Sequence, residues 1–350
     1  MGVYAVTGSA SGMGCAAASK LRAAGHTVIG VDIASEADVV ADLSTASGRR
    51  EAAEKVLALA DGRLDGAVLA AGLGPMPGRD RARLITQVNY FGVVDLLRAW
   101  RPALALADRA KVVVFSSNST TTVPLVPGRA VRALLAGDGA RAVRSLRAFG
   151  KMAPAFAYAA SKIAVSRWVR TAAVSPAWIG AGIRLNAIAP GAVATPLLDK
   201  QLATPSEARQ IKSFPVPAGG FGDPSHLGDW VVFMLSDAAD FLCGSVIFVD
   251  GGSDAYYRAE DWPRPVPLSG LPAYLKRMRS WKPRGLPRRA PGVFDRTPGG
   301  GGVVAAAHGQ AVGHVGEQEP DLPFREEPGE GQGHSAVTHG PELARPHRRE

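Results

Sequence analysis

The chain has 350 residues, of which 46% are hydrophobic and 20% are charged, so most of it can bury the core of one large domain or two modest ones. The net charge of +9 is unevenly spread, with nine Lys or Arg residues and one acid between Arg264 and Arg296; no stacking aromatics or DNA-binding motif accompany them, so we expect no nucleic-acid partner. With only two cysteines, no cationic leader and no long apolar run, we expect neither a disulfide framework nor a membrane span, and a cytoplasmic location.

Short apolar runs alternate with longer helical patterns over the first 260 residues, which predicts an α/β fold with a single Rossmann-type, doubly wound parallel sheet. The runs are apolar throughout, as expected when helices cover both faces of a sheet. The first helix is expected from about Gly14 to Ala24, with Gly25 as its stop. The expected strands are Val3–Val6, Thr27–Val31, Asp65–Ala70, Val112–Ser116, Arg184–Ile188 and Val246–Val249, with Val39–Val40 as a further candidate.

Two segments depart from this alternation. Residues 119–153 contain a basic helical stretch from about Arg129 to Phe149, which is either a surface insertion or a cap on a cleft or an oligomer contact. Half of the 26 prolines and five of the seven histidines fall in residues 261–350, where no apolar periodicity lasts long enough to form a core. We therefore expect one domain over residues 1–258 and a disordered tail over 259–350. The tail histidines lack paired ligand spacing, and we expect no metal.

A glycine turn, Gly8-x-x-x-Gly12-x-Gly14, follows the first strand and opens the first helix. Glycines there permit a tight turn and close approach to a pyrophosphate, which would lie at the positive end of the helix. The spacing differs from G-x-G-x-x-G, so the turn by itself is a moderate signal. Asp32 closes the second strand, where a carboxylate can bind the adenosine ribose or simply end the strand. No Lys or Arg lies in the turn to neutralise a 2′-phosphate, so we expect NAD rather than NADP.

A phenol and an ammonium are spaced one helical turn apart at Tyr158 and Lys162. A free tyrosine has a pKa of about 10, and a cation within ~4–6 Å lowers that pKa. Tyr158 could then take a proton from an alcohol as hydride leaves, or return it to a carbonyl. The Y-x-x-x-K pattern is common by chance, but here it follows Ser117 at a strand end.

Over roughly Val3 to Tyr257 the chain resembles the short-chain dehydrogenase/reductase family. Within that family the resemblance is closest to the bacterial NAD-dependent 3α-hydroxysteroid dehydrogenase/carbonyl reductase subgroup, which also shares the long insertion. One departure is Ala70, where many members have Asn. The motifs that carry the resemblance are Thr7–Gly14, Asp32, Asp42-Leu43, Ala70-Ala71-Gly72, Asn89, Ser116-Ser117, Tyr158–Lys162, Asn186–Gly191, Thr195 and Asp250-Gly251-Gly252.

The resemblance implies a role for each matching residue. Ser117, rather than Ser116, would orient the substrate oxygen beside Tyr158. Lys162 would bind the nicotinamide ribose, and Asn89 would hold a water that links Lys162 to solvent, unless it is simply a buried polar group. The implied catalytic residues are Ser117, Tyr158, Lys162 and Asn89; the implied cofactor-binding residues are Gly8, Ser11, Gly12, Met13, Gly14, Asp32, Asp42, Leu43, Ala71, Gly72, Tyr158, Lys162, Pro190, Gly191, Val193 and Thr195.

The expected function is NAD-dependent interconversion of a secondary alcohol and a ketone on a bulky, steroid-like substrate. Residues 196–221 would form an apolar lid, or an amphipathic helix packed on the core. The resemblance leaves an aromatic-alcohol dehydrogenase acting on a coniferyl-like alcohol as an alternative, together with a catalytically idle NAD-binding regulator. Because relatives commonly pair through helices, we also expect a homo-oligomer, either a dimer or a tetramer.

Overall fold

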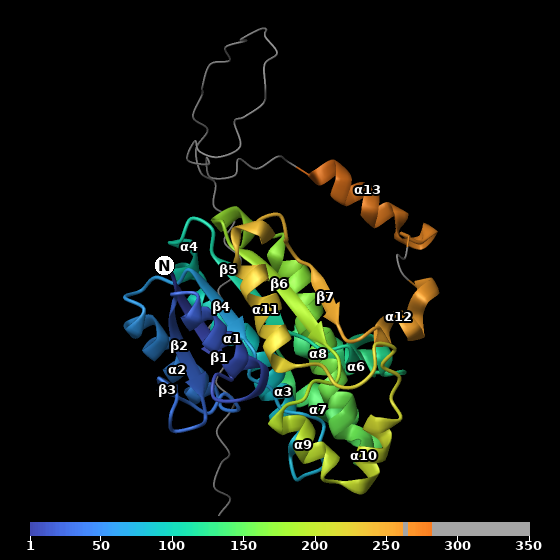
Figure 1. The fold of residues 1–350 in the computed structure, drawn as a ribbon. Helices are drawn as coiled ribbons and strands as arrows, with labels where there is room; N and C mark the ends of the chain where they lie inside the picture. Colours follow the sequence, from blue (N-terminus) through green and yellow to red (C-terminus); the bar gives the residue numbers. More distant parts are fainter. Residues whose placement is uncertain (262–264, 282–350) are drawn as a thin grey trace, which may run out of the picture. The chain divides into compact units, whose positions relative to one another are not determined.

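A parallel sheet forms the centre of the molecule (Figure 1). The computed structural model describes residues 1–261 and 265–281, and within them seven strands pair in the order β3-β2-β1-β4-β5-β6-β7. The order reverses between β1 and β4, which is the position where open α/β sheets bind ligands. The strands are β1 Val3–Thr7, β2 Thr27–Asp32, β3 Val39–Val40, β4 Gly66–Leu69, β5 Lys111–Phe115, β6 Arg184–Pro190 and β7 Val246–Val249.

The sequence prediction of this sheet is confirmed for every expected strand, with bounds that differ by one or two residues. Even the two-residue β3 is present at Val39–Val40, paired with the end of β2. The all-parallel pairing agrees with strand runs that are apolar throughout, because helices cover both faces.

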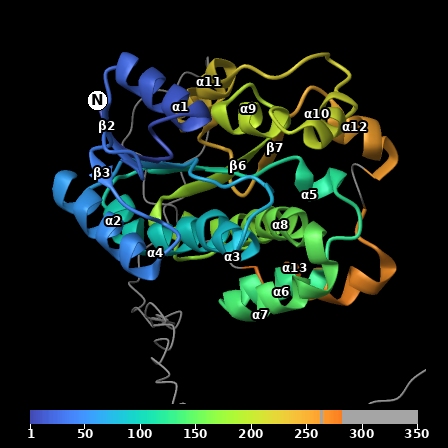
Figure 2. The ribbon, with the colours of Figure 1, turned by 90° about the horizontal axis from the view of Figure 1, so that it is seen from below.

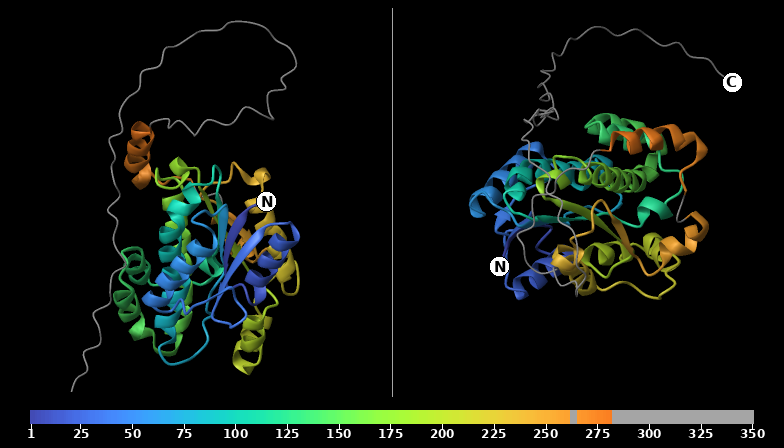
Figure 3. Two further views of the ribbon diagram at one scale, coloured as in Figure 1. Left: turned by 90° about the vertical axis from the view of Figure 1, so that its left-hand side faces the viewer. Right: turned by 90° about the horizontal axis from the view of Figure 1, so that it is seen from above.

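Helices cover the two faces of the sheet in separate layers (Figures 2 and 3). One face carries α1 Gly12–Ala23 and α11 Pro224–Leu235, which pack against each other. The other carries α2 Ala46–Leu59, α4 Gly92–Ala105 and α8 Ala153–Ala173. The remaining helices of the central part are α3 Arg81–Thr86, the π-helix η1 Gln87–Phe91, η3 Ile179–Ala181, α9 Pro196–Leu202, α10 Pro205–Lys212 and η4 Asp237–Ala239.

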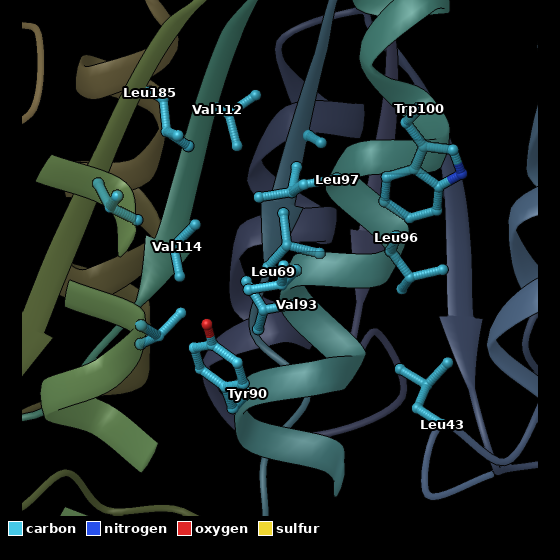
Figure 4. Close-up of a cluster of buried hydrophobic side chains, with 14 of the residues drawn as sticks. Leu43, Leu69, Tyr90, Val93, Leu96, Leu97, Trp100, Val112, Val114 and Leu185 are labelled. Carbon is cyan, nitrogen blue, oxygen red and sulfur yellow. The ribbon is translucent and has the colours of Figure 1, made fainter. Parts of the chain in front are cut away.

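The larger core lies between the sheet and the layer that contains α4 and α8. Figure 4 shows Leu97 of α4 directed toward the strand that carries Leu69, whereas the indole N–H of Trp100 donates a hydrogen bond to the carbonyl oxygen of Ala53 in α2 at 3.4 Å. Both α4 side chains are fully buried, and burying a leucine completely stabilises a fold by about 2 kcal/mol. This packing fixes the helix that continues from η1, and so the position of Asn89 within η1.

The basic insertion folds as short helices, in agreement with the prediction of a helical segment: α5 Ser119–Thr122, α6 Gly128–Leu135, α7 Gly139–Leu146 and the 3-10 helix η2 Arg147–Met152. The expected single stretch is divided because Gly137, at φ +76°, follows the end of α6. Asp138 then begins α7, and its carboxylate accepts a hydrogen bond from the Arg141 backbone N–H at 2.7 Å. Leu134 and Leu146 are fully buried in the larger core, so the insertion packs against the domain.

Beyond β7 the chain forms α12 Ser253–Arg258, η5 Ala259–Asp261, η6 Leu268–Gly270 and α13 Leu271–Ser280. The sequence prediction of a tail without secondary structure is wrong for α13. Leu271, Leu275 and Met278 recur at helical spacing, and the last turn carries cations that favour a helix C-terminus. No residue of α13 is buried, which agrees with the expected lack of a core. Residues 262–264 and 282–350, with the tail histidines, lie outside the described part of the chain. Among described helices, none combines the length and apolarity needed to cross a bilayer.

Candidate active site

A cavity of about 460 Å³ lies at the carboxyl ends of β1, β2 and β4, beside the point where the strand order reverses. Its walls come from the glycine turn, the ends of β2 and β4, the segment after β3, and the start of α9. Eleven of the sequence-predicted cofactor-binding residues line it: Gly8, Ser11, Gly12, Met13, Gly14, Asp32, Asp42, Leu43, Ala71, Gly72 and Thr195.

The glycine turn leaves no space for side chains at two positions. A Cβ on Gly14 would overlap the carbonyl oxygen of Gly8, and Gly8 itself has φ +70° and would meet the Ala71 backbone nitrogen at 2.8 Å. Helix α1 begins at Gly12, within this turn, and the side chain of Ser11 does not cap it. The first N–H groups of α1 therefore have no side-chain cap, and they form a positive pole suited to phosphate.

Two carboxylates lie on the other wall of the cavity. Asp32 accepts hydrogen bonds from the backbone N–H groups of Ala10 at 3.0 Å, Ile33 at 2.7 Å and Ala34 at 3.2 Å, so it ties the glycine turn to the end of β2. A carboxylate has about four acceptor positions, which leaves room for a ribose hydroxyl. Asp42 accepts from the backbone N–H and hydroxyl of Ser44 at 2.8 and 2.9 Å. Both carboxylates are thus held in fixed orientations.

Tyr158 and Ser117 meet through their side chains at the end of β5. Burial raises the pKa of the Tyr158 phenol above its ordinary value, and the hydrogen bond from Ser117 opposes that rise. The sequence predicts a lowered pKa for Tyr158. The protein by itself does not produce this lowering, because the effect of desolvation is larger than that of the hydrogen bond from Ser117. The side chain of the neighbouring Ser116 makes a different contact, with its hydroxyl 2.6 Å from that of Ser166.

Lys162 lies one turn after Tyr158 on α8, as the spacing predicts. Its ammonium donates a hydrogen bond to the carbonyl oxygen of Phe115 at 2.7 Å and lies 6.0 Å from the centroid of the Tyr158 ring. Burial lowers the pKa of Lys162 to about 8, because a desolvated amine disfavours its charged form. A Cβ on Gly72 would lie 3.9 Å from Nζ, so the ammonium adjoins the cavity wall.

Asn89 lies in the π-helix η1, a type of segment that often occurs at functional sites. Its Oδ1 accepts a hydrogen bond from the backbone N–H of Leu73 at 2.8 Å, and its Nδ2 donates to the carbonyl oxygen of Leu73 at 3.0 Å. The fully buried amide thus holds the loop after β4, which also forms a wall of the cavity. Sequence reasoning anticipated the residue but not this contact.

Several predicted cofactor-binding residues lie outside the cavity lining. Lys162 adjoins its wall at Gly72, and the others that do not line it are Tyr158, Pro190, Gly191 and Val193. Gly191 lies against Asp250, and the carbonyl oxygen of Pro190 accepts a hydrogen bond from the Asn118 backbone N–H at 2.9 Å. In the described part of the chain, no three His, Cys, Asp or Glu side chains gather in a group that could hold a metal.

Some lining residues had no role in the sequence prediction, among them Val31, Ile33, Arg81, Leu84 and Val88. Val31 and Ile33 flank Asp32 and Val88 precedes Asn89, so their positions in the motifs could have indicated them. Arg81 follows a loop of irregular sequence, and no motif indicates where its side chain points.

The start of α9 closes one side of the cavity. Thr195 caps the helix by accepting a hydrogen bond from the Leu198 backbone N–H at 3.4 Å, and Pro196 occupies its first turn. A Cβ on Gly12 would lie 3.3 Å from the Thr195 methyl group, and one on Gly74 would lie 3.0 Å from Leu197. The expected lid segment therefore contacts the loop after β4 through Leu197, and Thr195, which directly precedes that segment, contacts the glycine turn.

Comparison with known proteins agrees with this arrangement. The chain is 40% identical over 258 residues to 3-alpha-hydroxysteroid dehydrogenase/carbonyl reductase of Comamonas testosteroni, which covers 74% of this chain and 98% of that protein. The chain belongs to the short-chain dehydrogenase/reductase family. A sequence model described as enoyl-(acyl carrier protein) reductase also matches residues 129–254. The prediction of this family and of an alcohol/carbonyl oxidoreductase is confirmed.

Two further relatives extend the comparison. Cis-4-hydroxycyclohexanecarboxylate dehydrogenase of Sinomonas cyclohexanicum is 32% identical over 269 residues, covering 72% of this chain and 96% of that protein. The crystal structure of a 3-alpha-hydroxysteroid dehydrogenase from Pseudomonas sp. B-0831, complexed with NADH, is 42% identical and superposes with a TM-score of 0.69. It covers 74% of this chain and 100% of that one.

Proposed function

We propose that this oxidoreductase interconverts a secondary alcohol and a ketone on a bulky, steroid-like substrate, with NAD(H) as cofactor and Tyr158 as general acid/base. The observation that carries the proposal is the contact between the Tyr158 and Ser117 hydroxyls, next to the Lys162 ammonium at the wall of the cavity. A hydroxyl pair of this kind can hold a carbonyl or alcohol oxygen and exchange a proton with it.

The residues of the cavity fit a dinucleotide. The uncapped start of α1 suits a pyrophosphate, and the Asp32 carboxylate at the end of β2 suits ribose hydroxyls and disfavours a 2′-phosphate. The relative from Pseudomonas sp. B-0831, whose structure contains NADH, supports the same choice. When bound, NAD⁺ supplies the hydride acceptor.

The chain's own residues would manage the proton. In oxidation the alcohol O–H bond breaks and its proton passes to the Tyr158 phenolate oxygen, while the hydride leaves from the carbon that bears this hydroxyl. Ser117 would donate a hydrogen bond to the substrate oxygen and hold it beside Tyr158. Because burial disfavours the phenolate, the Lys162 ammonium and the charge of the oxidised cofactor must offset that cost.

The substrate class rests on the relatives. Two of them are named for 3-alpha-hydroxysteroids and one for a hydroxycyclohexane carboxylate, and all three names describe a secondary alcohol on a saturated six-membered ring. The start of α9 supports the same class, because Leu197 adds an apolar side chain to the cavity wall.

A substrate panel with a matched variant tests the proposal. We expect NAD⁺ reduction, followed by NADH absorbance, with 3α-hydroxysteroids and not with coniferyl alcohol. Tyr158→Phe should lower kcat by about 10²–10⁴-fold. The variant should bind NADH as the wild type does, measured by protein fluorescence. Turnover of coniferyl alcohol alone would favour the aromatic-alcohol alternative, and NADH binding without any turnover would favour a regulator.

The homo-oligomeric state and the cytoplasmic location stay predictions of the sequence. Size-exclusion chromatography with light scattering measures the first directly, and a monomer would contradict it.

A further inference from the structure

Arg81 is the cation that the structure adds to the dinucleotide cavity. It is the first residue of α3 and follows Asp80, whose backbone has φ +55°. Its Nε and Nη2 both donate hydrogen bonds to the carbonyl oxygen of Gly74, at 3.2 and 3.0 Å. Among the described residues that line the cavity, Arg81 is the one with a positive charge, against the two carboxylates of Asp32 and Asp42.

Among the described residues this guanidinium has no counter-ion. No carboxylate lies within 4.0 Å of it in the described part of the chain, and its Nη1 has no hydrogen-bond partner there. Partial burial already lowers the pKa of Arg81, since desolvation disfavours the charged form. By contrast, the buried Arg49 is paired with Asp95 at 2.8 Å. A half-buried guanidinium with one open edge is suited to an anionic ligand.

The position of Arg81 indicates which anion it binds. Its acceptor Gly74 lies against Leu197, and Thr195 of the same segment lies against Gly12 of the glycine turn. Helix α3 packs against α8, on the side of the sheet opposite α1 (Figure 2). The side chain therefore reaches the same cavity as the start of α1, from the other face of the sheet.

We propose that Arg81 binds the pyrophosphate of the bound dinucleotide, opposite the start of α1, and so holds the loop after β4 and the start of α9 around the cofactor. The inference rests on the proposed use of NAD(H). The group that binds is a diphosphate, so the free nucleotide ADP serves as the probe. A carboxylate on the substrate is a less suitable partner, because Ser117 and Tyr158 lie outside the lining of this cavity.

The test compares dissociation constants of NADH, ADP, 2′-AMP and adenosine for the full-length wild type, Arg81→Gln, Arg81→Lys and the control Arg83→Gln. Arg83 is an exposed arginine on the same helix. Calorimetry or protein fluorescence gives each constant. We expect Arg81→Gln to weaken NADH and ADP by about 10-fold or more, and to leave adenosine within about twofold. Arg81→Lys should lie between it and the wild type, and the control should match the wild type.

Salt dependence adds a second measurement. The slope of log Kd for ADP against log salt concentration should be smaller for Arg81→Gln, because one charge contact is lost. If Arg81→Gln lost the same affinity for ADP as for adenosine, Arg81 would only hold Gly74 in place. If the dissociation constant of ADP were unchanged in this variant, Arg81 would contact no phosphate. A selective loss for 2′-AMP would place a different phosphate beside it. Each of these three results overturns the proposal, whereas a wild type that fails to bind NADH refutes the proposed function instead.

Discussion

Replacing Lys162 by methionine should change how the stability of the protein depends on pH. The amine is buried, and its pKa falls from an ordinary value of 10.5 to about 8. Between these two values the unfolded chain holds one more proton than the folded chain, so wild-type stability rises with pH through this window. Below pH 8 both states are protonated, and the full cost of burying the charge remains. Methionine carries no proton, so Lys162→Met lacks this contribution.

The magnitude follows from the size of the shift. One pKa unit corresponds to about 1.36 kcal/mol, so burying the charged amine costs about 3 kcal/mol at neutral pH. At about pH 9.5 most of the folded amine is neutral, whereas the unfolded amine is still mainly charged. The free energy of unfolding of the wild type should therefore gain about 2 kcal/mol over Lys162→Met between pH 7 and pH 9.5. The lost hydrogen bond to Phe115 adds a constant offset and leaves this difference unchanged.

Urea denaturation followed by circular dichroism at several pH values measures the difference. Lys151→Met, at an exposed position, is the matched control and should follow the wild type at every pH. If the gap between wild type and Lys162→Met stays constant from pH 7 to pH 9.5, the amine keeps its charge in the fold and the reasoning is refuted. The same variant should lose turnover, because the cation beside Tyr158 is gone.

Two further predictions concern the cavity walls. Asp32→Ala should narrow the preference for NAD over NADP, measured as the ratio of kcat/KM values; unchanged discrimination would show that Asp32 only ties Ala10 to the strand end. Asn89→Ala should lower the free energy of unfolding by about 2–4 kcal/mol, since it leaves both backbone groups of Leu73 without their buried partner. A loss below about 1 kcal/mol in urea denaturation would mean that water replaces the amide.

Much of the fold follows from local patterns. Six apolar runs predicted six strands, and even Val39–Val40 was indicated by its extended character. The glycine turn was predictable because the overlap at Gly14 involves the backbone of Gly8, only six residues away. Helix α13 was missed because a short apolar stripe without a core is a weak signal among prolines.

The sequence by itself determined which groups can react, because strand runs, the glycine turn and the four-residue spacing of Tyr158 and Lys162 are local properties of the chain. Only the tertiary structure decided their electrostatics. The pKa of Tyr158 rises and that of Lys162 falls because of what packs around them, and desolvation depends on neighbours that are distant in sequence. The same holds for Arg81, whose place in the cavity depends on a loop that Asn89 and Leu197 fix from two other parts of the chain.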